Sequence, residues 1–421
     1  MMPKPPKRSR PASTPKIEHK PSPPRQPEPD FSIDEAELES KSNAKKQRKL
    51  LIAPHKHFKR FWKWWLGLNR NERFAVIAVA LLVFGAGALG WFTLVQPDSN
   101  PSLTLIRHPK PKPKAPTTVA SPLTGAQIDP ALAARPVTGI MIENSDDARP
   151  QSGLQDAGVV YEAIAEAGIT RFLALFQEGQ PHYIGPVRSL RPYYIDFAAP
   201  FQASIVHVGG SPDALAEVTS GGFRNLDQFY NGAYFTRISS RYAPHNVYTS
   251  FAKLDALNSA KGYTKSTFTG WPRKADKKLA TPTAKTIHLA ISSRDFYADY
   301  AYDATTNTYM RSEGGAPHTE LISAGDKAGP QLHPKVVIAL VMGLSNGALD
   351  ASGAYYSNYI DYGSGQMYVF QDGGVTTGVW SKSGTSDQFH FSEDNGNPIK
   401  LDAGQTWITL VSDPSKVTYA P

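Results

Sequence analysis

Two arginines three residues apart, Arg188 and Arg191, lie in the segment GPVRSLRPYY between two prolines and two tyrosines. A planar guanidinium group binds a carboxylate or phosphate through two parallel hydrogen bonds, which an ammonium group cannot copy. Pro192 disfavours a helical backbone at Arg191, so PYYIDFA is predicted to be a short helix that begins at Pro192. A cation at a helix N-terminus needs a neighbouring anion. The segment therefore predicts either a site for an anionic ligand or a buried ion pair with Asp or Glu.

Further side chains that could hold an anion lie in the same half of the chain. The turn after the segment ASIVH carries Gly209, Gly210 and Ser211, and its glycines let a ligand approach the N-terminus of the helix predicted to follow. We therefore predict that Arg188, Arg191 and this turn form one anion-binding site. The full predicted binding set is Arg149, Arg171, Arg188, Arg191, Gly209, Gly210, Ser211, Arg241 and Asn246.

As an alternative to anion binding, the same region could carry out acid–base catalysis. Glu162 and Glu166 are four residues apart, so they share a face of either a helix or a strand. Two carboxylates could act as acid and base in glycan cleavage, although such pairs more often face solvent or bind an arginine. The catalytic candidates are Glu143, Glu162, Glu166, His207 and His245. The sequence leaves open whether the protein is an enzyme.

Several reaction classes lack their motifs. The chain has no cysteine, which excludes a thiol nucleophile, a disulfide and a lipid-bearing cysteine. It contains no HEXXH motif, Asp-rich calcium loop, P-loop or GXGXXG fingerprint after a strand, and Ser211 does not lie in a GXSXG elbow. We therefore predict no metal site and no cofactor.

The basic charge is concentrated in the N-terminal part. Residues 1–73 carry 18 Lys+Arg and 8 Asp+Glu, or +10, whereas residues 74–421 carry 27 and 29, or −2. We therefore expect no nucleic-acid binding by the globular part. Residues 1–73 are predicted to be a disordered, cytoplasmic basic tail. Its end is predicted to be an amphipathic segment on anionic lipid, because cations alternate there with Trp62, Trp64 and Trp65.

A charge-free segment, FAVIAVALLVFGAGALGWFTLV, occupies residues 74–95. As a helix it would span about 33 Å, which matches a hydrocarbon core of about 30 Å. We predict an uncleaved transmembrane signal anchor, and the preceding cations place the N-terminus in the cytoplasm and the rest outside. The chain is thus expected to be a single-pass protein of the cell membrane. Residues 96–121, rich in Pro and Lys, are predicted to be an extracytoplasmic linker.

From residue 122 onward the chain is predicted to be globular. In residues 122–270, PVTGIMIEN and ITRFLALF predict strands, and ASIVHVGGSPDALAEV predicts a strand, a turn and a helix capped by Ser211. In residues 271–421, alternating segments divided by Asp-Gly and Asn-Gly turns predict hairpins. An α/β half is therefore expected before a β-rich half.

These segments also resemble a known family. RPVTGIMIEN, ARPQSGL, GITRFLALF, IGPVRSLRPYYIDFA, HVGGSP and RYAPHN, in this order, are similar to the YerB-like lipoproteins, whose two domains have no known function. The resemblance covers residues 122–415. It implies an extracytoplasmic protein with an N-terminal α/β domain and a separate C-terminal domain, folded as a layered α/β (α+β) sandwich of two sheet layers and a helical layer. It supplies no activity and no catalytic residues, and this chain lacks the lipid-bearing cysteine.

Two functions follow from the sequence. The first is a membrane-anchored protein of the cell envelope that binds an anionic glycan, a peptide carboxylate or an envelope protein through its arginines. The second is a cell-wall hydrolase or transferase that uses Glu143, Glu162 or Glu166 with His207 or His245. Convergence of the arginines alone would favour binding, and a carboxylate beside a histidine in the same pocket would favour catalysis.

Overall fold

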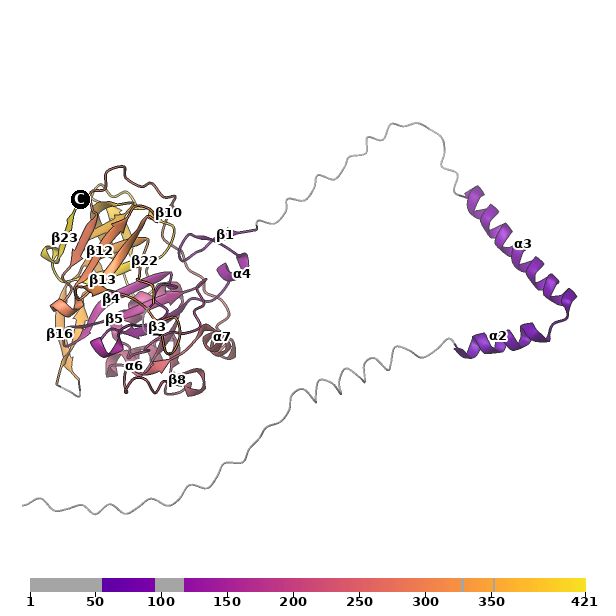
Figure 1. Ribbon diagram of the computed structural model, residues 1–421, viewed down its shortest axis with the longest axis horizontal. Helices are drawn as coiled ribbons and strands as arrows, with labels where there is room; N and C mark the ends of the chain where they lie inside the picture. Colours follow the sequence, from indigo (N-terminus) through magenta and orange to yellow (C-terminus); the bar gives the residue numbers. More distant parts are fainter. Residues whose placement is uncertain (1–54, 95–116, 327–328, 351–352) are drawn as a thin grey trace, which may run out of the picture. The chain divides into compact units, whose positions relative to one another are not determined.

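The computed structural model describes residues 55–94, 117–326, 329–350 and 353–421 (Figure 1). The chain divides into two compact units, residues 1–110 and residues 111–421. The first unit contains α2 (His55–Gly67) and α3 (Arg70–Leu94), and the strands of the described residues all lie in the second. Most of the predicted basic tail (1–54) and of the predicted linker (96–116) lies outside the described residues.

The predicted transmembrane signal anchor is wrong. Within the part of the chain that the structure describes, no helix is long and apolar enough to cross a membrane. Helix α3 begins at Arg70 rather than at the charge-free segment, so its first turn contains three charged residues. Asn69 and Glu72 cap this turn reciprocally, since the Asn69 N–H donates to Glu72 Oε2 (2.8 Å) and the Glu72 N–H donates to Asn69 Oδ1 (3.0 Å). The charged turn is thus an integral part of the helix.

A mixed sheet of 12 strands is the centre of the second unit (Figure 1). Its main path runs in the order β20-β19-β18-β15-β22-β4-β5-β3-β6-β7, and the hairpin β16–β17 joins β4. The first half of the unit supplies β3 (Thr138–Glu143), β4 (Val159–Glu166), β5 (Ile169–Phe176), β6 (Ser204–His207) and β7 (Arg224–Asp227). The second half supplies β15 (Val336–Val341), β16 (Leu344–Leu349), β17 (Tyr355–Tyr359), β18 (Gly363–Gln371), β19 (Gly374–Lys382), β20 (His390–Glu393) and β22 (Thr406–Val411).

The two halves join where β22 pairs with β4. The strands are parallel, with Thr406 opposite Val159 and Thr409 opposite Glu162. The sequences of β22 (TWITLV) and β15 (VVIALV) are nearly continuous apolar runs, buried on both faces, as expected for central parallel strands. The predicted fold class, a layered α/β sandwich after a transmembrane helix, is therefore wrong. The structure is β-rich, because strands of both halves share one sheet.

The remaining elements surround this sheet. The helices are α4 (Pro130–Ala133), α5 (Pro192–Ala198), α6 (Pro212–Ser220) and α7 (Phe251–Ala260), with short 3-10 helices η1 (Asp146–Ala148), η2 (Ala199–Phe201), η3 (Gly232–Tyr234), η4 (Arg294–Phe296) and η5 (Pro414–Lys416). A five-stranded sheet contains β14 (Ala316–Pro317), β13 (Thr308–Glu313), β12 (Ala298–Asp303), β11 (Thr286–Leu289) and β23 (Val417–Ala420), in this order. Strand pairs form from β1 (Val119–Ala120) and β2 (Gln127–Ile128), β8 (Thr236–Arg237) and β9 (Val247–Tyr248), and β10 (Arg273–Lys274) and β21 (Leu401–Asp402).

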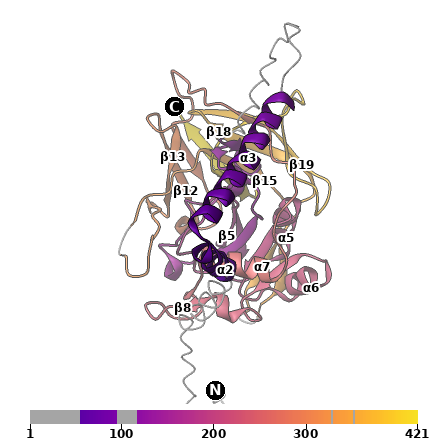
Figure 2. The ribbon, with the colours of Figure 1, turned by 90° about the vertical axis from the view of Figure 1, so that its right-hand side faces the viewer.

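The core lies on both faces of the large sheet. On one face, Leu173 of β5 and Ile408 of β22 belong to the same apolar cluster as Phe197 of α5. On the opposite face, Val337 of β15 packs in a cluster with Ile287 of β11. Figure 2 shows α5 and α6 on one side of the sheet, and β12 and β13 on the other. The segments that follow β5 and β6 therefore lead into α5 and α6 on the helical side of the sheet.

Two helix starts predicted from local rules are confirmed. Helix α5 begins at Pro192, and Arg191 precedes it with an extended backbone (φ −131°, ψ 155°). Helix α6 begins at Pro212 after Ser211, although the Ser211 side chain makes no capping hydrogen bond. These helix starts fix the two loops that carry the candidate binding residues. The predicted division of the globular part at residue 270 stays a prediction.

Candidate functional site

The loop that carries the two arginines, residues 185–191, lies beside the turn Gly209–Ser211. The Leu190 N–H donates to Gly209 O (2.9 Å), and the Ser211 N–H donates to Leu190 O (3.2 Å). The Arg188 N–H donates to Met141 O in β3 (2.9 Å), which fixes the same loop to the large sheet. Backbone hydrogen bonds, rather than side chains, therefore bring Arg188 against the glycine turn.

Arg188, Gly209 and Gly210 line one cavity of about 510 Å³, here called the Arg188 cavity. Gly209 adopts a left-handed backbone (φ +60°), and a Cβ placed there would lie 3.1 Å from the Phe229 ring. Glycine is therefore the residue that suits this turn. Arg237 also lines the cavity and donates from Nη1 to Asn246 Oδ1 (2.9 Å). The predicted binding residue Asn246 thus positions an arginine that the sequence analysis did not select.

Glu143, the last residue of β3, contacts two other predicted residues at once. Its Oε1 lies 3.1 Å from Arg188 Nε, and its Oε2 lies 3.0 Å from His245 Nδ1. The Ser145 hydroxyl also donates to Glu143 Oε1 (3.1 Å). The Glu143 side chain is only 4% exposed, whereas those of Arg188 and His245 are 25% and 19% exposed. The structure therefore places a buried carboxylate behind a partly exposed arginine and a partly exposed histidine.

The contact with Glu143 selects one tautomer of His245. A carboxylate 3.0 Å from Nδ1 favours a proton on that nitrogen. In neutral His245 the Nε2 atom is then an acceptor, and the exposed Asp147 lies near it, with Oδ2 3.9 Å away. This is the arrangement of a histidine that can accept a proton from water or a hydroxyl group.

Arg171 and Arg191 instead share one carboxylate. Their Nη2 atoms lie 2.5 Å and 2.6 Å from the two oxygens of Glu166. Arg171 also donates to Ser189 O (2.8 Å), and the Arg191 guanidinium lies 4.6 Å from the Tyr356 ring centroid. Burial opposes ionisation of Glu166, but the charges and hydrogen bonds of the two arginines lower its pKa below the ordinary value. These residues form the buried ion pair that the sequence analysis kept as an alternative.

Of three further candidates, the side chains of Arg241 and His207 are hydrogen-bonded to other described residues and that of Ser211 is not. Arg241 donates to Ala148 O (2.5 Å) and Pro150 O (2.7 Å). His207 is fully buried, with Nδ1 2.8 Å from Gly209 O and Nε2 2.9 Å from Asn225 Oδ1. Ser211 is 3% exposed, and its hydroxyl has no hydrogen-bond partner among the described residues. His207 therefore supports the glycine turn from behind and does not line the Arg188 cavity.

A buried polar cluster centred on Arg311 was missed by the sequence analysis. Arg311, on β13, is fully buried, and its Nη2 lies 2.9 Å from Glu162 Oε1. Its Nε donates to His318 Nδ1 (2.9 Å), and its guanidinium lies 4.5 Å from the Trp407 ring centroid. Trp407 Nε1 in turn donates to Glu162 Oε2 (3.2 Å). The predicted catalytic residue Glu162 is thus enclosed in the protein interior and paired with a cation.

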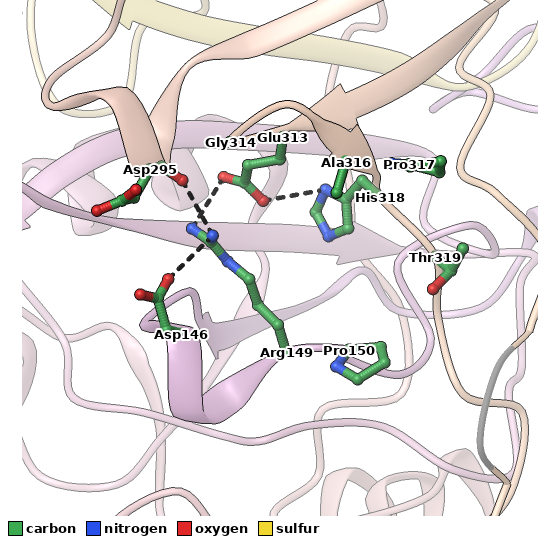
Figure 3. A pocket seen from close by; sticks show the side chains of 10 residues that line it. All are labelled: Asp146, Arg149, Pro150, Asp295, Glu313, Gly314, Ala316, Pro317, His318 and Thr319. Carbon is green, nitrogen blue, oxygen red and sulfur yellow. Dashed lines mark hydrogen bonds and ion pairs between the residues drawn. The ribbon is translucent and has the colours of Figure 1, made fainter.

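Glu313, the last residue of β13, lies in the wall of a second cavity of about 310 Å³ (Figure 3). Asn144 Nδ2 donates to its Oε1 (2.6 Å), and His318 Nδ1 lies 3.2 Å from its Oε2. Burial raises the pKa of Glu313 to about 7, and burial lowers the pKa of His318 well below its ordinary value. A carboxyl group that titrates near neutral pH at a cavity wall can donate or accept a proton.

Arg149, a predicted binding residue, lines the second cavity. Figure 3 shows its guanidinium between Asp146, Asp295 and Glu313. Its Nη1 lies 3.1 Å from Asp146 Oδ1 and donates to Asp295 O (2.9 Å), and its Nη2 lies 3.4 Å from Glu313 Oε1. The guanidinium nitrogens of Arg149 therefore contact groups of the protein itself. A sequence signal for this cavity exists in SEGGAPHTE, where Glu313 and His318 flank a Gly-Gly turn at the end of β13.

The family matches, a related protein and a solved structure all relate this chain to the same family. Residues 123–264 match the family described as the N-terminal domain of a protein of unknown function (DUF3048), and residues 287–408 match its C-terminal domain. The chain is 29% identical over 301 residues to "Putative lipoprotein YerB" of Bacillus subtilis (strain 168), covering 70% of this chain and 86% of that protein. The crystal structure of the YerB protein from Bacillus subtilis is similar, with a TM-score of 0.64 and 27% identity, covering 72% of this chain and all of that one. The chain therefore belongs to the YerB-like family, whose function is unknown.

Proposed function

We propose that this chain is an extracytoplasmic protein of the cell envelope that binds a phosphate or carboxylate group of an envelope glycan or peptide in the Arg188 cavity. The observation that carries the proposal is the position of Arg188. Its Nε atom is paired with Glu143, while its two terminal nitrogens make no hydrogen bond with the described residues, in the wall of a cavity that Arg237 also lines. A guanidinium held in this way presents two donors to a planar anion.

The exposure of the charged groups supports an anionic ligand rather than a cationic one. Asp227, which lines the cavity, and Glu143, which pairs with Arg188, are both buried, with 4% and 3% of their surface accessible. Asp227 Oδ1 accepts hydrogen bonds from the Gly209 and Phe229 N–H groups (3.1 Å each), so its charge is compensated by the backbone. Arg237 is exposed and Arg188 partly exposed. Among the residues that line the cavity, the exposed charges are therefore cations.

The rim of the cavity suits a glycan or a peptide. Phe229 and Tyr230 line it and are largely exposed. Exposed aromatic rings next to guanidinium groups contact the apolar faces of sugars and side chains while the cations bind the charged group. The extracytoplasmic location is supported by the description of the Bacillus subtilis relative as a lipoprotein.

Retention on purified cell-wall material tests this proposal. The full chain and its Arg188→Gln variant are incubated with walls that keep their anionic polymers and with walls from which these polymers have been removed. We expect retention on the intact walls, at least about a tenfold weaker retention of the variant, and little retention of either on stripped walls. Arg294→Gln, at an exposed arginine outside the cavity, is the matched control and should bind like the parent. Equal retention of all three proteins would contradict the proposal.

Competition identifies the group that is bound. Inorganic phosphate that releases the chain at lower concentration than acetate indicates a phosphate-bearing polymer, and the reverse order indicates a carboxylate. Release that follows ionic strength alone, whichever salt is used, would mean that no defined anion site exists.

A second candidate function, hydrolysis of an envelope polymer, is supported by the pairing of Glu143 with His245. In this reaction His245 Nε2 accepts a proton from water, the resulting hydroxide attacks the polymer, and the proton passes to the leaving group. Glu143 orients the imidazole, and Arg188 stabilises the negative charge that develops. His245→Gln separates the two functions. Hydrolysis predicts that the parent releases soluble fragments from walls and that the variant binds but releases none; absence of release by the parent leaves binding as the function.

A further inference from the structure

Helix α2 has two chemically opposite faces. Residues three and four positions apart share a face of a helix, and two separate sets in α2 follow this spacing. The apolar set is Phe58, Phe61, Trp62, Trp65 and Leu66, and the basic set is Lys56, Lys59, Arg60 and Lys63. The helix contains no acidic residue. It is therefore amphipathic, with an apolar, mainly aromatic set on one face and the basic set on another, and Trp64 lies between the two sets.

The apolar face of α2 is exposed in the structure. Phe61 and Trp62 are each 52% exposed, and Leu66 is 58% exposed. The Phe61 ring lies 6.4 Å from Trp65 and 5.8 Å from Trp64, measured between ring centroids, so these rings contact one another. Several large apolar side chains exposed together on one short helix indicate a surface that contacts a partner.

The end of α2 is fixed to the start of α3, but the two helices are separate (Figure 1). The Leu68 N–H donates to Trp65 O (3.4 Å), and Arg73 Nη2 donates to Leu66 O (3.0 Å). Asn69 and Glu72 cap the new helix, as described above. The faces of α2 therefore belong to α2 alone and do not continue along α3.

We infer that α2 lies along the surface of a membrane that contains anionic lipids, with its aromatic face at the boundary between headgroups and acyl chains. Two tryptophans and two phenylalanines with a single leucine on this face are typical of this boundary, whereas a helix that packs into another helix uses mainly aliphatic residues. The four cations match the phosphates of anionic headgroups. Surface binding of this kind requires no helix that crosses the bilayer, and it is independent of the Arg188 cavity.

The absence of cysteine allows a direct test on the full chain. Phe61→Cys reports on the apolar face and Lys63→Cys on the basic face, each labelled with a fluorophore that responds to polarity. The two proteins are mixed with vesicles of phosphatidylcholine alone or of phosphatidylcholine with phosphatidylglycerol. We expect a blue shift at position 61 with the anionic vesicles, little change at position 63, and loss of the shift at high salt.

Charge removal provides the second measurement. Replacing Lys56, Lys59, Arg60 and Lys63 by Gln should weaken binding to the anionic vesicles by about fivefold for each cation removed. The matched control replaces four exposed lysines of the globular unit, Lys261, Lys265, Lys277 and Lys400, by Gln and should bind like the parent. Equal responses in the two kinds of vesicle, or equal blue shifts at positions 61 and 63, would overturn the inference. So would equal losses of binding in the two quadruple variants.

Discussion

Glu162 and Arg311 form an ion pair of 2.9 Å in which neither side chain is accessible to solvent. Glu162 lies in β4, within residues 123–264, and Arg311 lies in β13, within residues 287–408. Each charge would be costly to bury alone, so each half of the globular unit supplies the charge that the other half needs. The pair is one physical reason why the two halves are expected to unfold together.

Breaking this pair should destabilise the protein strongly. Arg311→Met leaves the Glu162 carboxylate buried without its cation, and the free energy of unfolding should fall by about 3–5 kcal/mol. Urea denaturation followed by tryptophan fluorescence measures the loss. The exposed pair His288–Asp299 is the control, because its side chains are 38% and 42% exposed and Asp299→Asn should cost only about 0–1 kcal/mol. Similar losses in the two variants would mean that Arg311 does not compensate a buried charge.

Replacing Glu313 should change the pH dependence of stability. The folded pKa of Glu313 is about 7, above its ordinary value of 4.5, so between these values the folded state binds more protons than the unfolded state. Stability contributed by this group therefore falls as pH rises through that window, by up to about 1 kcal/mol per pH unit, and is constant above it. The Glu313→Gln variant should gain stability relative to the parent as pH rises from about 5 to about 8, as measured by urea denaturation.

His318 changes the pH dependence of stability in the opposite direction to Glu313. Its contribution must therefore be separated from that of Glu313. Burial lowers its folded pKa below 6.5, so the unfolded state binds more protons there and stability rises with pH up to about 6.5. Glu313→Gln leaves that slope in place, and the difference between parent and variant isolates Glu313. A constant difference across the pH range would show that Glu313 is ionised in the folded protein throughout.

Lysine substitutions at the two arginines should have contrasting effects. Arg191→Lys keeps one charge but cannot reproduce the contacts with Glu166, Leu190 O and the Tyr356 ring, so it should lower stability by about 1–3 kcal/mol without changing wall retention. Arg188→Lys should weaken retention and change stability little, because its side chain is partly exposed. Thermal melts and wall binding of both variants provide the comparison. If Arg191→Lys lost retention at unchanged stability, Arg191 would belong to the ligand site.

Gly209→Ala should disturb both the turn and the cavity. The left-handed backbone at φ +60° costs a residue with a Cβ about 1–2 kcal/mol, and the new methyl group would press against Phe229. Gly222→Ala is the matched control, because its φ is +74° but a Cβ there meets nothing within 4 Å. Both variants should melt earlier, and only Gly209→Ala should also lose wall retention. Equal retention would place the ligand away from the turn.

Local features of the fold could be predicted because they depend on neighbours in the chain. Pro192 and Pro212 fix the first positions of α5 and α6, and the preceding Arg191 and Ser211 follow from the same rule. The loop that carries Arg188 does lie beside the Gly209 turn, but the predicted anion site of Arg188, Arg191 and this turn stays a prediction. The function of the site could not be predicted from these local features.

Contacts between distant segments could not be predicted. Glu166 can pair with any nearby arginine, and only the folded chain shows that it takes both Arg171 and Arg191 and leaves Arg188 to Glu143. Glu313 and His318 were missed because nothing local indicates that the five-stranded sheet packs on the face that carries Glu162. The signal anchor was predicted from the length of the charge-free segment and its basic flank, and neither shows where the helix that contains this segment begins.

The parallel pairing of β22 with β4 has a consequence for how such a protein can change over evolutionary time. A gene fragment that encoded only one half would produce a sheet with a long, apolar, unpaired edge, and such edges recruit strands from other molecules. Loss, duplication or exchange of a single half should therefore produce aggregates rather than smaller working proteins. The two halves are expected to be inherited together as one genetic unit, and variation between relatives should collect in the loops that lie away from this junction.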